Sequence, residues 1–282
     1  MAKVAVVTDS TATLPREYLE QYPIWVAPQV LIWGEETLLD GVDIQPQQFY
    51  ERLEKDPLHP TTSQVTPAKF REMFSNLLEM EYDILAVLVS PKLSGTVDSA
   101  NQAKEMFPGA PIEIVDSESI AMAMGFQVLV AARAAKEGAS LTECKDLALK
   151  SRPCTGVIFA VDTLEFLHRG GRIGGGAKFL GSALDIKPIL EIRDGRVESV
   201  ERVRTRRKSL ARVVRLIEER IAGRTPVRLA TLHANAEEDA RWLLDVGCAH
   251  LQPVEKIYSE VSPVVGTHAG PGTVGLAFMA GM

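Results

Sequence analysis

The chain has 282 residues, 46% of them hydrophobic, and a formal net charge of −6. This composition supplies enough apolar material for a substantial core, and the length suggests two domains. The mildly acidic balance excludes a bulk attraction to nucleic acid or to anionic lipid surfaces, so any contact with lipid or phosphate must come from a local site.

The sequence favours a cytoplasmic protein. The first nine residues show no basic region, long apolar core or cleavage site, so we expect no signal peptide. The apolar run Ala121–Ala135 contains polar residues and is shorter than the roughly 20 residues of a membrane helix. Cys144, Cys154 and Cys248 are far apart and odd in number, which argues for reduced thiols and against a disulfide framework or a CxxC metal site. We expect no bound metal.

Residues 1–152 alternate strands with helices, which predicts parallel βαβ units covered on both faces. The first strand, Val4–Thr8, is a β-branched apolar run that ends in the polar turn Asp9-Ser10-Thr11. The other predicted elements are, in order, a helix from Pro15 to about Gln21, a strand over Ile24–Ile32, helices that begin near Pro46 and Pro67, a strand over Ile84–Val89, a helix over Gly95–Phe107, a strand over Ile112–Val115, and helices over Met122–Glu137 and Leu141–Lys150.

Three of these strands end in short polar loops that contain Ser or Thr. One is the turn after the first strand, and the others are Ser90–Ser94 and Asp116-Ser117. In an open parallel sheet the carboxyl ends of the strands lie at one edge, and ligands bind there. The gathering of hydroxyl groups at this edge therefore indicates a binding site.

We place a domain boundary at Arg152-Pro153, after which residues 153–282 predict a mixed sheet with helices. Asp194-Gly195 lies between two apolar runs and is a strong hairpin signal. The predicted elements are a strand over Val157–Val161, a short helix over Leu164–His168, hairpin strands over Ile186–Ile192 and Val197–Val203, a helix over Arg207–Arg220, a strand over Val227–Leu232, a helix over Glu237–Asp245, and strands over Lys256–Ser259 and Val274–Met279. The predicted fold class is α/β, mostly parallel in the first half and mixed in the second.

Neither glycine-rich segment predicts a nucleotide site. Gly170–Gly176 lacks the G-x-G-x-x-G spacing, and its glycines with two nearby arginines fit either an anion site or a tight connection. Gly270–Gly275 has the spacing, but a strand is predicted after it where a dinucleotide site requires a helix.

Candidate polar binding groups lie in four segments. The loop Ser90–Thr96 fits an N-cap by Ser94, an oxyanion cradle of that hydroxyl with helix N-terminal amides, or both together. Thr61–Gln64 precedes a predicted helix, where turn chemistry is favoured. His268 is expected in a glycine-rich loop, where a ligand or catalytic role and a structural role both stay open. Asp9-Ser10-Thr11 lacks the second aspartate of a phosphotransferase loop, which favours a structural turn.

A basic cluster follows the predicted hairpin. Its default interpretation is a solvated face, and because no aromatic residues interleave with the charges we expect no nucleic-acid partner. The cluster consists of Arg202, Arg204, Arg206, Arg207, Lys208, Arg212 and Arg215.

Together and in this order, these motifs resemble the DegV family. The matching segments span nearly the whole chain, and each is weak alone but specific in combination. They are Val6-Val7-Thr8-Asp9-Ser10, Thr62-Ser63-Gln64, Leu93-Ser94-Gly95-Thr96, Val115-Asp116-Ser117, Leu164–Gly171 with Arg172-Ile173, and His268-Ala269-Gly270-Pro271-Gly272. Val65 and Thr66 follow Gln64 here, where many relatives place proline directly, and we interpret this as a local loop difference.

The resemblance implies two α/β domains, residues 1–152 and 153–282, with a lipid tunnel between them. It implies a non-catalytic protein that binds one long-chain fatty acid and no other cofactor. Such a protein serves as the lipid-binding subunit of a bacterial fatty acid kinase, whose kinase subunit converts the bound carboxylate to an acyl phosphate for phospholipid synthesis; transient membrane contact is compatible with that role. Carried over to this sequence, the carboxylate site comprises Thr62, Ser63, Ser94, Gly95 and His268, and Arg169 and Arg172 fall near the tunnel mouth, where they would meet the kinase.

A tunnel for the acyl tail also needs apolar walls and space. From composition we expect Phe179, Leu180 and Leu184 to line it, while the small residues of Gly174–Gly176, with Ala177 and Ala183, leave room for the chain.

The best alternative is an enzyme, a small-molecule phosphotransferase or hydrolase that uses Asp9, Asp116 and His268. Against this alternative, we find neither a nucleotide-binding loop nor a set of metal ligands in the sequence. A divalent-metal-dependent activity of the isolated protein would favour this alternative.

Overall fold

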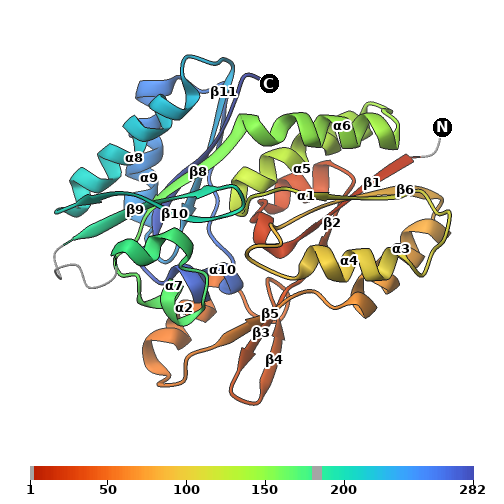
Figure 1. Cartoon of the computed structure of the whole chain (residues 1–282), viewed down its shortest axis with the longest axis horizontal. Coiled ribbons are helices and arrows are strands. Elements are labelled where there is room, and N and C mark those ends of the chain that lie inside the picture. The colour runs from red at the N-terminus through yellow and green to blue at the C-terminus, as the bar shows by residue number, and fades with distance from the viewer. Residues whose placement is uncertain (1–2, 180–185) are drawn as a thin grey trace.

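The computed structural model describes residues 3–179 and 186–282, except for the side chain of Phe179. Figure 1 shows two main sheets next to each other and a smaller sheet beneath them. No helix in the described ranges is both long and apolar enough to cross a membrane.

The first main sheet has four parallel strands in the order β2-β1-β6-β7, as the βαβ pattern predicted. Two of its helices begin at side-chain caps, since the Thr66 and Ser140 side chains accept hydrogen bonds from backbone amides three residues later. The strands are β1 (Lys3–Asp9), β2 (Ile24–Ala27), β6 (Tyr82–Leu88) and β7 (Ile112–Asp116). The helices of this half are α1 (Arg16–Gln21), α2 (Pro46–Lys55), α3 (Pro67–Glu79), α4 (Thr96–Lys104), α5 (Ala121–Lys136) and α6 (Leu141–Ser151).

Alternate residues of the central strand face opposite sides of this sheet. Ala5 and Val7 join the apolar cluster of α3 and α4, whereas Val4 and Val6 join the cluster that contains α5. Both faces of β1 are therefore covered, which explains why the strand is a continuous apolar run.

The second main sheet has six strands in the order β10-β9-β8-β13-β11-β12, and only the pair β11-β12 is parallel. Asp194 and Gly195 both have positive φ, as a two-residue hairpin turn between β9 and β10 requires. Helices α8 and α9 cover the outer face (Figure 1). The elements are β8 (Thr155–Ala160), β9 (Lys187–Arg193), β10 (Arg196–Val203), α8 (Arg206–Ile221), β11 (Val227–His233), α9 (Glu237–Leu251), β12 (Glu255–Ile257) and β13 (Val274–Ala280).

Helix α5 packs between the two main sheets. It contacts β1 and β6 on one side and β8, β11 and β13 on the other. Its residues from Ala121 to Leu129 are all buried, and all except Gln127 are apolar or small, as a helix covered on every side requires. The α/β fold class with a mostly parallel and a mixed sheet is confirmed, while the division at residue 152 stays a prediction.

A third, three-stranded antiparallel sheet was not predicted. The expected strand over Ile24–Ile32 is two strands, because Pro28 and Gln29 interrupt it, and each strand joins a different sheet. The small sheet has the order β4-β3-β5, with β3 (Val30–Trp33), β4 (Glu36–Leu39) and β5 (Thr61–Ser63). The turn expected at residues 61–64 is therefore wrong for its first three residues.

Several members of the basic cluster are neutralised by neighbouring carboxylates. Arg206 pairs with Asp239 at 2.8 Å, and Arg212 pairs with Glu201 and Glu219 at 2.6 and 2.7 Å. These ion pairs fit the solvated face that the sequence favoured.

Candidate functional site

A cavity lies where the two main sheets meet the small sheet, and we call it the inner cavity. Its empty space is about 980 Å³ including the opening to solvent. Two short helices complete its wall, α7 (Glu165–Arg169) and α10 (Pro263–Ala269). The apolar lining consists of Val89, Leu93, Ile120, Ala121, Val157, Phe159, Leu167, Ile192, Val197, Leu232, Val264, Val265 and Ala269.

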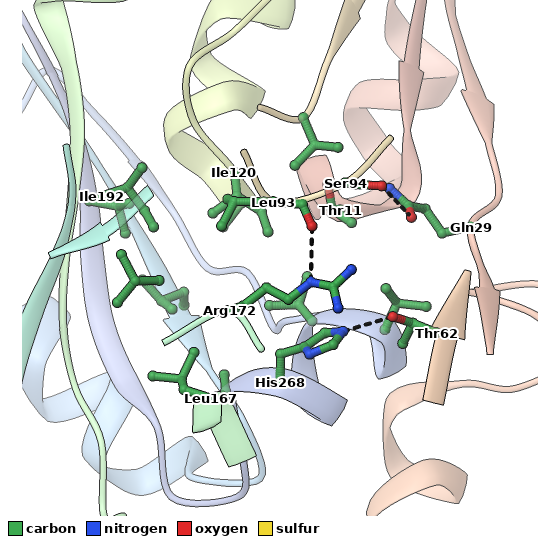
Figure 2. A pocket seen from close by; sticks show the side chains of 18 of the residues that line it. Thr11, Gln29, Thr62, Leu93, Ser94, Ile120, Leu167, Arg172, Ile192 and His268 are labelled. Atoms are coloured by element: carbon green, nitrogen blue, oxygen red, sulfur yellow. Dashed lines mark hydrogen bonds between the residues drawn. The ribbon is translucent and has the colours of Figure 1, made fainter. Parts of the chain in front are cut away.

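The polar groups of the inner cavity gather at one end. Figure 2 shows Ile120 and Ile192 on one side and Gln29 and Thr62 on the other. An arginine and a histidine lie between the two groups. The polar lining consists of Thr11, Gln29, Thr62, Ser63, Gln64, Ser94, Arg172, His268 and Thr273. The cavity thus has the character of an amphiphile, apolar along most of its wall and polar at one end.

His268 lies in the last turn of α10, so its expected place in a loop was wrong. Its Nε2 is 2.7 Å from the Thr62 hydroxyl oxygen. Burial, with the charge of Arg172 as a second cause, lowers the pKa of His268 to about 4, so the imidazole is neutral at pH 7. When Nε2 carries the proton and donates to Thr62, the Thr62 hydroxyl proton is left for a ligand oxygen.

Gly170 makes room for this histidine. A Cβ atom at residue 170 would lie 2.0 Å from the His268 Nδ1 atom, so any larger residue would displace the ring. The Nδ1 atom itself is buried and has no hydrogen-bond partner in the described part of the chain. Gly170 is therefore required to leave space for the His268 ring in the site, and not only for the backbone conformation of this segment.

Arg172 carries the positive charge of the polar end. Its Nε donates to the Leu93 carbonyl at 3.1 Å (Figure 2). Its Nη1 donates to the Gly170 carbonyl at 2.7 Å, and the two bonds together fix the guanidinium plane. Within the described residues no carboxylate pairs with Arg172, and both of its hydrogen bonds, from Nε and Nη1, go to backbone carbonyls, which leaves Nη2 without a partner. A fixed, unpaired guanidinium at the end of an apolar cavity favours an anionic ligand group.

A buried network positions the Ser94 hydroxyl. Asp9 is fully buried and accepts hydrogen bonds from the Thr11 backbone and hydroxyl, from Val89 N, and from Gln29 Nε2 at 3.2 Å. This fixes the Gln29 amide, whose Oε1 accepts from the Ser94 hydroxyl at 3.4 Å (Figure 2). That contact is long for an O–H donor. The Ser94 and Thr96 hydroxyl oxygens are 2.8 Å apart, and when Thr96 is the donor of that pair the Ser94 proton can turn from Gln29 to a ligand oxygen.

The other residues of the predicted carboxylate site differ in their placement. Ser63 lines the inner cavity, whereas Gly95 does not. A Cβ at Gly95 would lie 2.3 Å from the Gln64 amide oxygen, so the glycine gives space to Gln64, which does line the cavity.

Comparison with known proteins gives the family. A family model described as uncharacterised protein, DegV family, matches residues 3–281. The chain belongs to the DegV family. A DegV domain-containing protein of Streptomyces coelicolor is 38% identical over 276 residues, which are 97% of each chain, and Protein DegV of Bacillus subtilis is 35% identical over 98% of each chain. The family resemblance inferred from the motifs is confirmed.

Solved DegV structures have the same fold. A DegV family protein from Thermus thermophilus, reported for its fatty acid binding, has a TM-score of 0.93 and 33% identity, with 99% of each chain covered. DegV of Bacillus subtilis, described as a fatty acid binding protein, has a TM-score of 0.89 and 33% identity, with 99% of this chain and 100% of that chain covered.

The predicted tail-lining residues of this DegV chain are not tested. Leu180 and Leu184 lie outside the described residues, as does the side chain of Phe179. The neighbouring glycines lie against strand β10, since a Cβ at Gly174 would lie 2.3 Å from the Val197 carbonyl oxygen. They therefore allow close approach of two backbone segments.

The residues of the enzyme alternative do not meet in the inner cavity of this DegV chain. His268 lines it, but neither Asp9 nor Asp116 does. Asp9 is committed to its buried hydrogen bonds, and burial raises its pKa in spite of them. Asp116 accepts a hydrogen bond from the Glu118 amide at 2.7 Å. Among the described residues, no group of three or more His, Cys, Asp or Glu side chains is arranged to hold a metal ion.

Proposed function

We propose that this DegV chain binds one long-chain fatty acid in the inner cavity and presents its carboxylate to a kinase partner, which converts it to an acyl phosphate. The observation that carries the proposal is the fixed guanidinium of Arg172 at the hydroxyl-rich end of an apolar cavity. Relatives with the same fold are described as fatty acid binding proteins, which supports the ligand class.

The energetics fit an amphiphilic ligand. Burial of each CH₂ group contributes about 0.8 kcal/mol, so an acyl tail provides most of the affinity. A buried carboxylate would be costly without partners. Thr62 and Ser94 would donate hydrogen bonds to it and Arg172 would balance its charge, while His268 would hold the Thr62 hydroxyl in place.

The chemical step would take place on the bound carboxylate. One carboxylate oxygen attacks the γ-phosphorus of a nucleoside triphosphate held by the kinase, and the bond from that phosphorus to the bridging oxygen breaks. The products are an acyl phosphate and a nucleoside diphosphate. The part of this chain is to bind, orient and neutralise the nucleophile, which makes it the non-catalytic subunit.

The ligand class is tested by native mass spectrometry of the purified protein, followed by organic extraction and identification of the released molecule. We expect one fatty acid per chain. A protein that is empty and also fails to take up added palmitate or oleate would refute the proposal.

The carboxylate contacts are tested with Ser94→Ala. Loss of one hydrogen bond to a charged group should weaken palmitate binding or acyl-phosphate formation by about tenfold. Ser75→Ala, on α3 and outside the inner cavity, is the matched control and should change neither. Unchanged binding and phosphorylation in Ser94→Ala would contradict the assignment of that hydroxyl.

A further inference from the structure

A second cavity adjoins the polar end of the first, and we call it the outer cavity. Its empty space is about 770 Å³ including its opening to solvent. Thr62, Arg172 and His268 line both cavities. The groups that would hold a carboxylate in the inner cavity therefore also form a wall of the outer one.

The outer cavity has an excess of positive and hydrogen-bonding groups. Its polar lining is His59, Thr61, Thr62, Arg169, Arg172, Thr267 and His268, and no carboxylate lines it in the described part of the chain. Two guanidinium groups and two imidazoles thus face a space that opens directly beyond the proposed carboxylate site.

Four of these side chains line only the outer cavity, and two of them, His59 and Arg169, can turn to a ligand. Arg169 pairs with Glu165 at 2.5 Å, but their side chains are 43% and 61% exposed, and such exposed pairs contribute only about 0–1 kcal/mol. His59 is exposed, and its ring packs edge-on against Phe166 with centroids 6.2 Å apart. Exchange of Glu165 for a phosphate dianion would give Arg169 a stronger, bidentate partner.

We propose that the outer cavity is a phosphate subsite that holds the phosphoryl group of the acyl phosphate, with His59 and Arg169 as contacts that the fatty acid itself does not use. This inference rests on the proposed function, since the acyl chain and its carbonyl group would stay in the inner cavity. His59 and Arg169 would therefore contact the acyl phosphate product but not the fatty acid substrate.

The test compares two ligands with the same acyl chain on the isolated, delipidated protein. One is palmitate, and the other is 2-oxoheptadecylphosphonate, in which a methylene replaces the bridging oxygen of palmitoyl phosphate so that the phosphonate resists hydrolysis. Both are measured by displacement of a fluorescent fatty acid. His59→Ala and Arg169→Ala should each bind the phosphonate about tenfold more weakly, and palmitate within about twofold of the unaltered protein.

Arg16→Ala is the matched control. Arg16 also forms an i,i+4 pair with a glutamate, Glu20 at 2.6 Å, but lines neither cavity. It should leave both affinities unchanged. Equal effects of His59→Ala and Arg169→Ala on the two ligands, or no effect on the phosphonate, would overturn the phosphate subsite while fatty acid binding stands. Failure of the unaltered protein to bind palmitate would overturn the proposed function itself.

Discussion

Gly170 is the residue at which a single methyl group would disturb the site most directly. Its φ of −76° suits alanine, so Gly170→Ala adds only the contact with His268 Nδ1. We expect the ring to shift, the bond to Thr62 to weaken and the dissociation constant for palmitate to rise about tenfold. The measurement is fluorescence displacement.

A double-mutant cycle separates this contact from other effects of the alanine. In a His268→Ala background the clash is absent, so Gly170→Ala should change palmitate affinity by less than about twofold. An equally large loss of affinity in both backgrounds would show that Gly170 acts on something other than the histidine.

The lowered pKa of His268 also predicts a pH dependence of stability. The unfolded chain takes up a proton near pH 6.5, but the folded chain does so only near pH 4. As the pH falls below about 6.5 the unfolded state is therefore favoured, and His268 should cost about 1–2 kcal/mol of unfolding free energy between pH 7 and pH 5.

Comparison with His268→Gln isolates this contribution. His233, whose pKa burial also lowers to about 4, titrates in both proteins and cancels. The unfolding free energy of the variant, from urea titrations at pH 7 and pH 5, should fall less than that of the unaltered protein. Parallel losses would mean that His268 titrates normally in the folded state.

At the scale of elements, helix α10 carries the histidine to the site. The helix has only seven residues, and the Ser262 hydroxyl accepts from Val265 N at its start while Asp40 accepts from Val264 N. Ser262→Ala should lower the unfolding free energy by about 1 kcal/mol and also weaken palmitate binding.

Ser140→Ala is the control for this cap. Ser140 caps α6, outside the inner cavity, so its loss should cost similar stability and leave palmitate affinity unchanged. If Ser262→Ala and Ser140→Ala bound palmitate with the same affinity, the position of His268 would not depend on the cap of α10.

The strength of local patterns decided which elements the sequence could predict. Long apolar or periodic segments such as β1, β6 and α5 were recognised. The short strands β4 and β5 were not recognised, because three or four residues provide too little periodicity. Signals for α10 were present, with Ser262 and Pro263 at its start and Gly270 at its end, but the apolar segment between them is short.

The site was predictable in part. The motifs named Thr62, Ser94 and His268, and the structure brings all three to the inner cavity from β5, the loop after β6, and α10. Gln29 was missed, although Pro28 within a predicted strand marked a break there. Arg172 was expected only at the partner surface, because its bonds to the Leu93 and Gly170 carbonyls depend on tertiary contacts that no local pattern encodes.

At the scale of the whole molecule, a ligand in the inner cavity should stabilise the two halves of the chain together, since the loop after β6 and the start of α5 line it on one side and strands β8 to β11 on the other. At a free palmitate concentration of 100 times the dissociation constant, the gain in unfolding free energy should be about 2.7 kcal/mol. Calorimetry of delipidated protein with and without palmitate measures it. Methyl palmitate, which lacks the charge, should raise the melting temperature less, and equal shifts would deny Arg172 a role in carboxylate binding.

The strand order of the mixed sheet has a consequence for synthesis on the ribosome. Strand β13 lies between β8 and β11, although it follows both of them in the chain. While β13 is still inside the ribosome, β8 and β11 lack their common neighbour and expose unpaired edges. His268 and Thr273 are likewise made after nearly every other wall residue. A nascent chain therefore cannot acquire its lipid step by step, and loading has to wait until the last strand has been released.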